Sequence, residues 1–367
     1  MTSIDSQDHT MQSVDQSISA RPAGGGKALA GMWWVAWRQH RAQLAISMGG
    51  LAVVAVVLLI FRIAVANRLS ELTSGYPNCD LAVGDPTTQG CPGQAYSVLY
   101  GDFGTTWGLL RMGILILPLV LGAFVGAPLF AREFEQHTQV FALTQSVGRL
   151  RWWATKIVVA AVPVVLGMVG LGLMVDWVAA PYSVFSYGPM DTPGFETRGI
   201  IPAAFTVLTI ALGVTSGIVL RSTVISLVVT LVVAGLLVVA LGLVRPHLLA
   251  PTRVVTPVVL TAQPDQFYPD GQSWYLDHNY LDANGTPVAF VGDCPALSGD
   301  GPTSPSDEDV NREWAACLQK QGITSEYTDY LPSGRRWPLQ GLVAGITTIL
   351  SGLVLAAGAL RLRRRVL

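Results

Sequence analysis

The residues whose side chains could best take part in chemistry lie in the segment Pro128–Trp153, between two long apolar runs. Its charged and titratable residues are Arg132, Glu133, Glu135, His137, Arg149 and Arg151. One imidazole beside two carboxylates superficially resembles a metal-ligand set. A zinc site needs three or four ligands, however, and no second ligand lies four residues after His137. The pattern therefore predicts a charged surface helix rather than a metal centre.

The sequence carries no other recognisable reaction motif. The run Gly24–Lys27 resembles a phosphate-binding loop, but Ala28 stands where serine or threonine is required, and the upstream glycine is missing. Neither His-Glu-x-x-His nor Gly-x-Ser-x-Gly occurs, and no cysteine pair has the Cys-x-x-Cys spacing of a thiol metal site. We expect no enzyme activity and no cofactor on this chain, so energy for any active transport must come from another chain.

The same segment has an apolar side as well as a charged one. Phe134, Phe141, Leu143 and Val147 supply that apolar side. The combination favours an amphipathic helix along the cytoplasmic membrane face, which we place at residues 131–152, with a polar edge that docks a partner. The alternative is a polar loop that merely joins two membrane spans.

Composition assigns the chain to the membrane. Of its 367 residues, 51% are hydrophobic and 13% are charged, whereas a soluble domain carries about 25% charge. The formal net charge of -1 says little about partners. No basic, aromatic stripe indicates binding to nucleic acid.

Six apolar runs are long enough to cross about 30 Å of hydrocarbon, which takes roughly 20 helical residues. Because lipid offers no hydrogen-bond partners to the backbone, each run must be helical. The runs are Leu44–Ala66, Leu109–Phe130, Ala154–Val178, Ile200–Leu220, Thr223–Val244 and Pro338–Leu360. They predict an all-α polytopic membrane protein with six transmembrane helices, in which Arg221 and Ser222 form a tight turn between the fourth and the fifth.

Spans one to five occupy residues 44–244, and span six follows the large outer loop. The segments that precede the first span and follow the sixth complete the predicted domain organisation. Residues 1–31 are polar and predict a disordered cytoplasmic tail. Residues 32–43 mix three tryptophans with arginines, which favours an interfacial helix, although they could simply flank the first span. Residues 361–367 form a basic cytoplasmic tail.

The distribution of arginine and lysine predicts the orientation. With the N-terminus inside, the outer loops are acidic and the inner segments are basic. The inner cations are Arg38, Arg41, Arg132, Arg149, Arg151, Lys156, Arg221, Arg361, Arg363, Arg364 and Arg365. We therefore expect a multi-pass protein of the plasma membrane with both termini in the cytoplasm.

This orientation places all four cysteines outside, where disulfides persist. Local pairing, Cys79–Cys91 and Cys294–Cys317, is the simplest of three connectivities, and a cross-loop pairing or free thiols are the alternatives. Residues 245–337 predict a small extracellular subdomain stapled by the second pair. Its predicted elements are a helix from Ser306 to Gly322 and a short strand before Cys294, with the rest irregular.

Ionisable residues are scarce inside the apolar runs. Arg62 and Asp176 each lie near the outer end of a span. They are expected to reach toward water, or alternatively to pair with each other. No row of carboxylates or histidines suggests a proton relay, which counts against an ion-coupled transporter.

Taken together, the inner segment resembles that of ABC-2 type permeases, in particular the actinobacterial group. The matching residues are Ala131–Thr138 (AREFEQHT), Leu143–Ser146 (LTQS), Arg149 and Trp152. A second match covers Tyr330–Ser333, Arg336–Pro338 and Gln340. The resemblance runs from about Met32 to the C-terminus and departs at His137, where the family usually has glycine.

The resemblance implies an ABC-2 exporter-type bundle. Two such subunits, a second copy or a paralogue, pair in the membrane, and two ATP-binding subunits that carry ATP and magnesium dock beneath them. Residues 131–152 would be the coupling helix that receives their motion. The implied coupling residues are Arg132, Glu133, Glu135, His137, Thr138, Thr144, Gln145, Arg149 and Arg151.

Two functions follow as hypotheses. The first is a permease that exports a hydrophobic or amphipathic compound, such as a drug, antibiotic, lipid or peptide. The second is a non-transporting sensor or assembly scaffold, which would use the extracellular subdomain to bind a ligand or partner. An enzyme at the outer face ranks third because no catalytic set is visible.

Overall fold

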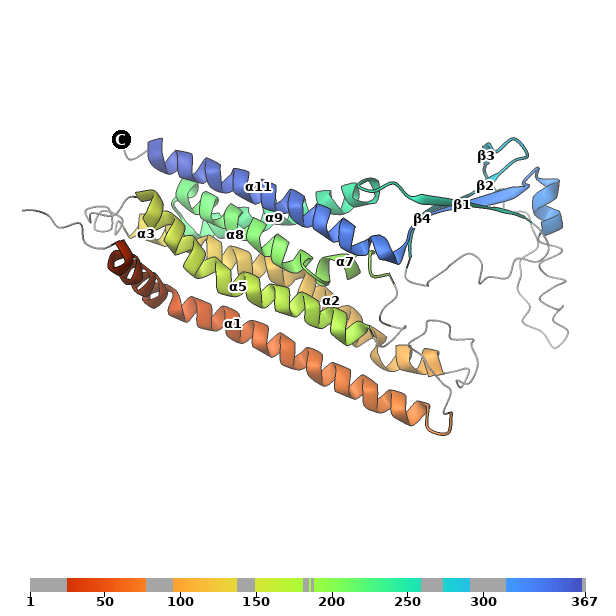
Figure 1. The fold of residues 1–367 in the computed structure, drawn as a ribbon, viewed down its shortest axis with the longest axis horizontal. Helices are drawn as coiled ribbons and strands as arrows, with labels where there is room; N and C mark the ends of the chain where they lie inside the picture. Colours follow the sequence, from red (N-terminus) through yellow and green to blue (C-terminus); the bar gives the residue numbers. More distant parts are fainter. Residues whose placement is uncertain are drawn as a thin grey trace, which may run out of the picture.

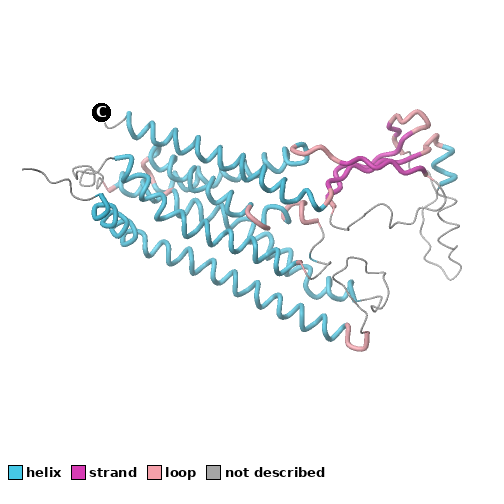
Figure 2. The backbone as a smooth tube through the Cα atoms, in the orientation of Figure 1, coloured by secondary structure: helices cyan, strands magenta, loops and turns pink. Residues whose placement is uncertain are grey.

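The computed structural model describes residues 25–76, 95–136, 149–180, 185, 188–258, 273–290 and 315–364. Its helices lie side by side along the long axis, and its strands gather at one end (Figures 1 and 2). The start of α1 (Gly25–Leu72) and the end of α11 (Arg336–Arg364) lie at the opposite end, together with α3 (Pro128–Glu135) (Figure 1). We call these the sheet end and the α3 end.

Six helical stretches in the described residues are long and apolar enough to cross a membrane, which agrees with the six predicted runs. Besides α1 and α11, the helices that carry them are α2 (Ala95–Gly126), α5 (Arg149–Ala179), α8 (Ile201–Leu220) and α9 (Thr223–Val244). The chain is therefore a multi-pass membrane protein.

The predicted boundaries were most accurate where the chain turns sharply. The start and end of α9 match the prediction, and α8 begins one residue later than predicted. In contrast, α1 begins at Gly25, so residues 25–31, which were predicted to be disordered, are helical. Residues 32–43 are also part of α1, and the predicted interfacial helix is therefore continuous with the first span.

The central element of the bundle is α8. It packs against α2, α3, α5, α9 and α11. In the most apolar part of each helix, 67% of α8 is buried within the protein, compared with 17% of α9. The helix α2 is almost as buried as α8, whereas α1, α5, α9 and α11 leave wide apolar faces exposed, as expected for helices surrounded by lipid.

The contact between α2 and α8 depends on glycine. A Cβ atom added at Gly126 would lie 2.6 Å from the carbonyl oxygen of Ile210, and one added at Gly213 would lie 2.7 Å from the amide nitrogen of Ala127. Both neighbours are backbone atoms, which cannot rotate away. Small residues therefore allow the two helix backbones to approach closely, as is common inside membranes.

The segment between α9 and α11 contains a sheet that the sequence analysis missed. Its antiparallel strands follow the order β1 (Thr252–Pro257), β4 (Ser325–Leu331), β2 (Trp274–Leu281) and β3 (Pro287–Val288). The prediction of an all-α fold with a largely irregular outer loop was wrong here. β3 lies in the stretch before Cys294 for which a short strand was predicted.

A local turn explains the hairpin between β2 and β3. The Oδ1 atom of Asp282 accepts hydrogen bonds from the amides of Asn284 and Thr286, each at 2.8 Å. Gly285 follows with a φ of 76°, in the left-handed region that favours glycine. An Asn-Gly pair between two strands is a strong hairpin signal.

The predicted helix in this segment is partly visible. Residues 315–320 are helical, Leu318 is buried, and Gly322 follows with a φ of 80°. The start of the predicted helix, at Ser306, lies outside the described residues. Cys317 is disulfide-bonded, but Cys79, Cys91 and Cys294 lie outside the described residues, so both predicted pairings and the stapled subdomain stay predictions.

The sheet is attached to the helices through its own hydrophobic cluster. Trp274 of β2 and Leu331 of β4 pack with Phe195, with Phe205 of α8 and with Leu339 of α11. Because these side chains come from the sheet, two membrane helices and the chain before α8, the sheet and the bundle share one packed cluster.

We predict that Gly126→Ala destabilises the protein because the added methyl group meets the backbone of Ile210. The cost should be roughly 1–3 kcal/mol, as for other overpacked interiors. Thermal unfolding in detergent measures it. Gly113→Ala in the same helix is the control, since its Cβ would meet nothing within 4 Å. Equal unfolding temperatures of the two variants would contradict the tight α2–α8 contact.

Candidate functional site

The charged segment that motivated the sequence analysis begins with α3, which is separated from α2 only by Ala127. Pro128 is the first residue of α3, and proline has no amide hydrogen to donate to the carbonyl four residues earlier. That carbonyl belongs to Phe124, and the side-chain amide of Gln43 in α1 donates to it at 2.5 Å. The break between α2 and α3 is therefore stabilised by a hydrogen bond from α1.

A buried ion pair connects α3 to α5. The ammonium group of Lys156 pairs with Glu133 and also donates to the carbonyl of Leu129 at 3.1 Å. It lies 5.3 Å from the ring centre of Phe130 and 5.1 Å from that of Trp152. Only 3% of the Lys156 side chain and 16% of the Glu133 side chain are exposed, so each charge depends on the other.

A second carboxylate connects α3 to α9. One oxygen of Glu135 accepts from the Thr223 amide at 2.8 Å, and the other accepts from the Thr223 hydroxyl at 2.7 Å. Thr223 is the first residue of α9, and the preceding Ser222 makes no capping hydrogen bond with its side chain. Glu135 thus supplies from another helix the N-terminal capping interaction that a local side chain usually provides.

The turn between α8 and α9 completes this contact. Arg221 ends α8 in the left-handed conformation, with a φ of 56°, and its amide donates to the Gly217 carbonyl at 3.2 Å. Its guanidinium lies 5.7 Å from the ring centre of Phe134 in α3. The end of α3 is therefore seated against the α8–α9 hairpin by both polar and aromatic contacts.

These contacts show what two of the predicted coupling residues do within the chain. Glu133 and Glu135 bind other helices of the same chain, and Glu135 is exposed, as are Arg132 of α3 and Arg151 of α5. Arg149 is the first residue of α5. The predicted coupling residues His137, Thr138, Thr144 and Gln145 lie outside the described residues. The predicted helix at 131–152 is not one separate element, because its beginning belongs to α3 and its end to α5.

At the α3 end, the two carboxylates of α3 therefore connect this helix to α5 and to α9. A displacement of α3 would act on α5 through Glu133 and on α9 through Glu135. Packed elements of this kind move as rigid bodies rather than deforming continuously. Among the described residues, no group of three histidines, cysteines, aspartates or glutamates could hold a metal ion. The contacts that the two carboxylates of α3 make are an ion pair and hydrogen bonds.

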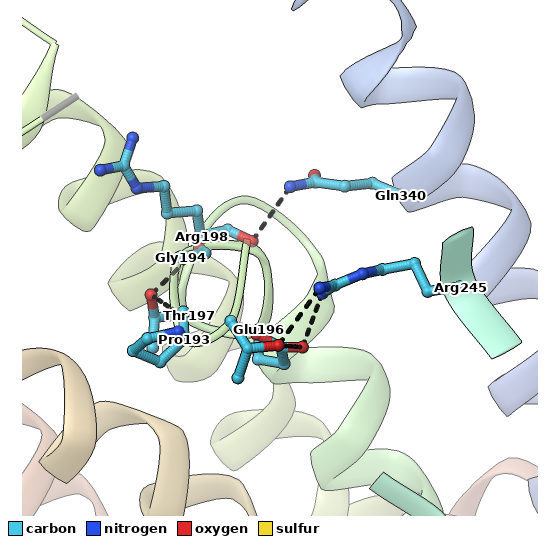
Figure 3. A network of polar contacts seen from close by, with 8 residues as sticks. Pro193, Gly194, Glu196, Thr197, Arg198, Arg245 and Gln340 are labelled. Carbon is cyan, nitrogen blue, oxygen red and sulfur yellow. Dashed lines mark hydrogen bonds and ion pairs between the residues drawn. The ribbon is translucent and has the colours of Figure 1, made fainter. Parts of the chain in front are cut away.

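The sheet end holds a second polar network that sequence reasoning missed (Figure 3). Arg245, directly after α9, donates to Glu196 at 2.6 Å and to the hydroxyl of Thr192 at 3.2 Å. The guanidinium also lies 4.6 Å from the ring centre of Phe195 and 4.7 Å from that of Trp274. Since Trp274 begins β2, this arginine joins the end of α9 to the sheet.

The same network reaches α11. Gln340 of α11 donates to the carbonyl of Arg198 at 3.4 Å, and the guanidinium of Arg198 donates to the carbonyl of Phe185 at 2.5 Å. Burial lowers the pKa of Arg198 to about 10, so the side chain remains protonated at neutral pH. The sequence signal was weak, because Phe185 and Arg198 lie in a short segment between two apolar runs and Gln340 lies within another run.

The alternative in which Arg62 pairs with Asp176 was wrong. Arg62 does not pair with Asp176 but donates to the carbonyl of Trp177 and lies 3.8 Å from the centre of its ring. Asp176 pairs with Arg336 at 2.5 Å instead. Sequence position placed both residues near the same membrane boundary, but it could not show that Trp177 faces α1 while Asp176 faces α11.

We predict that Lys156→Met strongly destabilises the protein, because it leaves the Glu133 carboxylate buried without its partner. Breaking a buried pair in this way typically costs about 3 kcal/mol or more. Adding Glu133→Gln to this variant should restore much of the loss in a thermal unfolding experiment. Arg151→Met, which removes an exposed cation from the same helix, is the control. A double variant as unstable as Lys156→Met would contradict this ion pair.

Comparison with known protein families gives a match for this chain. A family model described as "ABC-2 membrane transporter related" matches residues 48–245, which cover most of α1 and all of α2, α3, α5, α8 and α9. No curated protein and no solved structure matches the chain. The family model covers more than half of the 367 residues, and the chain therefore belongs to the ABC-2 membrane transporter related family.

Proposed function

We propose that this chain is the permease subunit of an ABC transporter that exports a hydrophobic or amphipathic compound. The observation that carries the proposal is α3. This short charged helix is connected to α5 and α9 by its two carboxylates, within the region that matches the family. A separate ATP-binding subunit, carrying ATP and magnesium, would push on α3 and so shift the packing of the membrane helices. ATP can drive such a shift only by binding one state better than the other.

Several further features belong to the same proposal. The α3 end would face the cytoplasm, with both termini, because Arg38, Arg41, Arg132, Arg221 and Arg363 gather on the chain segments at that end. A second copy or a paralogue would complete the transport path. On the outside, disulfides Cys79–Cys91 and Cys294–Cys317 would stabilise the loops. A drug, antibiotic, lipid or peptide would be the cargo.

The coupling proposal predicts that Arg132→Glu weakens binding of the ATP-binding subunit by about tenfold, equivalent to ~1.4 kcal/mol. Arg132 is exposed on α3, so reversing its charge should disturb the docking surface without disturbing the fold. Co-purification of an ATP-binding subunit that is co-expressed with this chain, and its substrate-stimulated ATP hydrolysis, measure the effect.

The matched control is Arg363→Glu, which reverses an exposed charge on α11 at the same end of the molecule. It should leave both readouts unchanged. If Arg132→Glu also leaves them unchanged, α3 is not the element that receives the motion. Variants of Glu133 or Glu135 are less informative, since their carboxylates hold helices of this chain together.

The orientation is tested independently with reporter insertions. Alkaline phosphatase inserted after Gly75, in the turn that follows α1 at the sheet end, should be active because it reaches the oxidising exterior. The same enzyme inserted after Gln136, at the end of α3, should be inactive. The reverse pattern would overturn both the topology and the proposed docking of an ATP-binding subunit at α3.

One structural observation supports the alternative function, a sensor or assembly scaffold. The sheet is joined to the bundle by the cluster around Trp274 and Leu331 and by Arg245, so a ligand bound outside could act on the membrane helices. Replacing both Arg245 and Glu196 with glutamine would weaken the connection between the sheet and α9 without leaving a buried charge unpaired. Such a variant separates the two functions, because a sensor would lose its response whereas basal transport would persist.

A further inference from the structure

A narrow groove lies between α8, α9 and α11, in the half of the bundle nearest the α3 end. Its volume is about 240 Å³, and its walls include Leu220 of α8, Val229 and Val233 of α9 and Val354 of α11. Val229 is 38% exposed and Val233 36% exposed, so the groove is open at the side of the bundle that faces lipid. Sites for drug-sized ligands usually occupy roughly 300–1,000 Å³, and this groove is smaller.

The polar groups in the walls are already satisfied within the chain. Thr215 donates to the carbonyl of Val354 at 3.0 Å. Ser216 and Thr230 lie 2.9 Å apart and share a hydrogen bond, and Thr230 also donates to the carbonyl of Ser226 at 2.6 Å. The groove therefore presents an apolar surface, which suits a hydrocarbon chain rather than a polar ligand.

Two exposed cations lie beyond the end of the groove nearest α3. Arg221 follows Leu220 directly. Arg361 lies seven residues after Val354, two helical turns further along the same face of α11 and about 10 Å away. Between them, Gly358 packs against Thr215, with an added Cβ only 2.9 Å from its hydroxyl, which confirms that this face of α11 points to α8.

Neither guanidinium is neutralised by a carboxylate in the part of the chain that the structure describes. Arg221 contacts the ring of Phe134, and the nearest described carboxylate at this turn, Glu135, is bound to Thr223. An apolar groove that ends at two cations without a described carboxylate partner complements the shape and charge of a phospholipid with an anionic headgroup. Arginine recognises phosphate well because its planar group can donate two parallel hydrogen bonds.

We propose that the α8–α9–α11 groove binds one acyl chain of an anionic phospholipid, whose phosphate is held by Arg221 and Arg361. The lipid contacts the end of α8 and the start of α9, close to the point where Glu135 caps α9. It would therefore stabilise the same turn that α3 contacts. This inference needs no ATP-binding subunit, so it stands or falls separately from the proposed transport function.

The test uses the purified full-length chain in detergent, with native mass spectrometry to count bound lipid during titration with phosphatidylglycerol or phosphatidylcholine. Phosphatidylglycerol should bind about tenfold more tightly. Arg221→Gln and Arg361→Gln should each weaken its binding by about tenfold, equivalent to ~1.4 kcal/mol. Equal affinity for the two lipids would overturn the recognition of an anionic headgroup.

Two matched controls make the test specific. Arg363→Gln removes the same charge from the opposite face of α11, nine residues after Val354, and should retain phosphatidylglycerol. Val233→Phe fills the groove and should abolish retention of the lipid, whereas Val232→Phe adds the same volume to α9 outside the groove walls. Equal losses of bound phosphatidylglycerol in Arg361→Gln and Arg363→Gln would overturn the site, as would unchanged lipid binding in Val233→Phe. A dimer that forms through α9 and excludes lipid from the groove would also overturn the site.

Discussion

The close approach of α2 and α8 is the constraint on which the rest of this bundle depends. Glycines at the contact let two backbones meet where any side chain would separate them, at Gly126 opposite Ile210 and at Gly213 opposite Ala127. Inside a membrane, lipid tails are as apolar as leucine, so the hydrophobic effect does not hold helices together and close packing must do so. Because α8 is enclosed on most sides, α2, α5, α9 and α11 are positioned by how they fit against it, and α1 packs in turn against α5 and α2.

Charges occur at the two ends of this packed centre, and at each end they join a different set of elements. At the α3 end, Lys156 and Glu133 neutralise each other between α3 and α5, and Glu135 caps α9. At the sheet end, Arg245 and Glu196 join α9 to the chain before α8 and, through Trp274, to the sheet. A buried charge is costly unless it is paired and hydrogen-bonded. Each pair therefore specifies which helices are neighbours, in addition to whatever stability it adds.

The sequence was sufficient to predict the membrane-spanning helices, because an uninterrupted apolar run can only form a helix in lipid. It was also sufficient to single out α3 by its charge. It could not identify partners across the bundle: nothing in the local pattern indicates that Glu133 meets Lys156, that Asp176 meets Arg336, or that Gln43 supplies the hydrogen bond that Pro128 withholds. The sheet was missed for a different reason. Its strands alternate with residues rich in proline, glycine and aspartate, although Asn284-Gly285 was a usable hairpin signal.

The two carboxylates of α3 explain how a single short helix could influence a large bundle. Glu133 and Glu135 are two residues apart, so they project from different sides of α3 and reach different helices. α3 cannot turn about its axis without straining one contact or the other, and it cannot shift without carrying α5 and the start of α9 with it. Since α9 is capped by Glu135 instead of by its own Ser222, the first turn of α9 is only as well ordered as its contact with α3. In the proposed transporter, a partner that grips Arg132 would therefore control both the position of α5 and the order of α9.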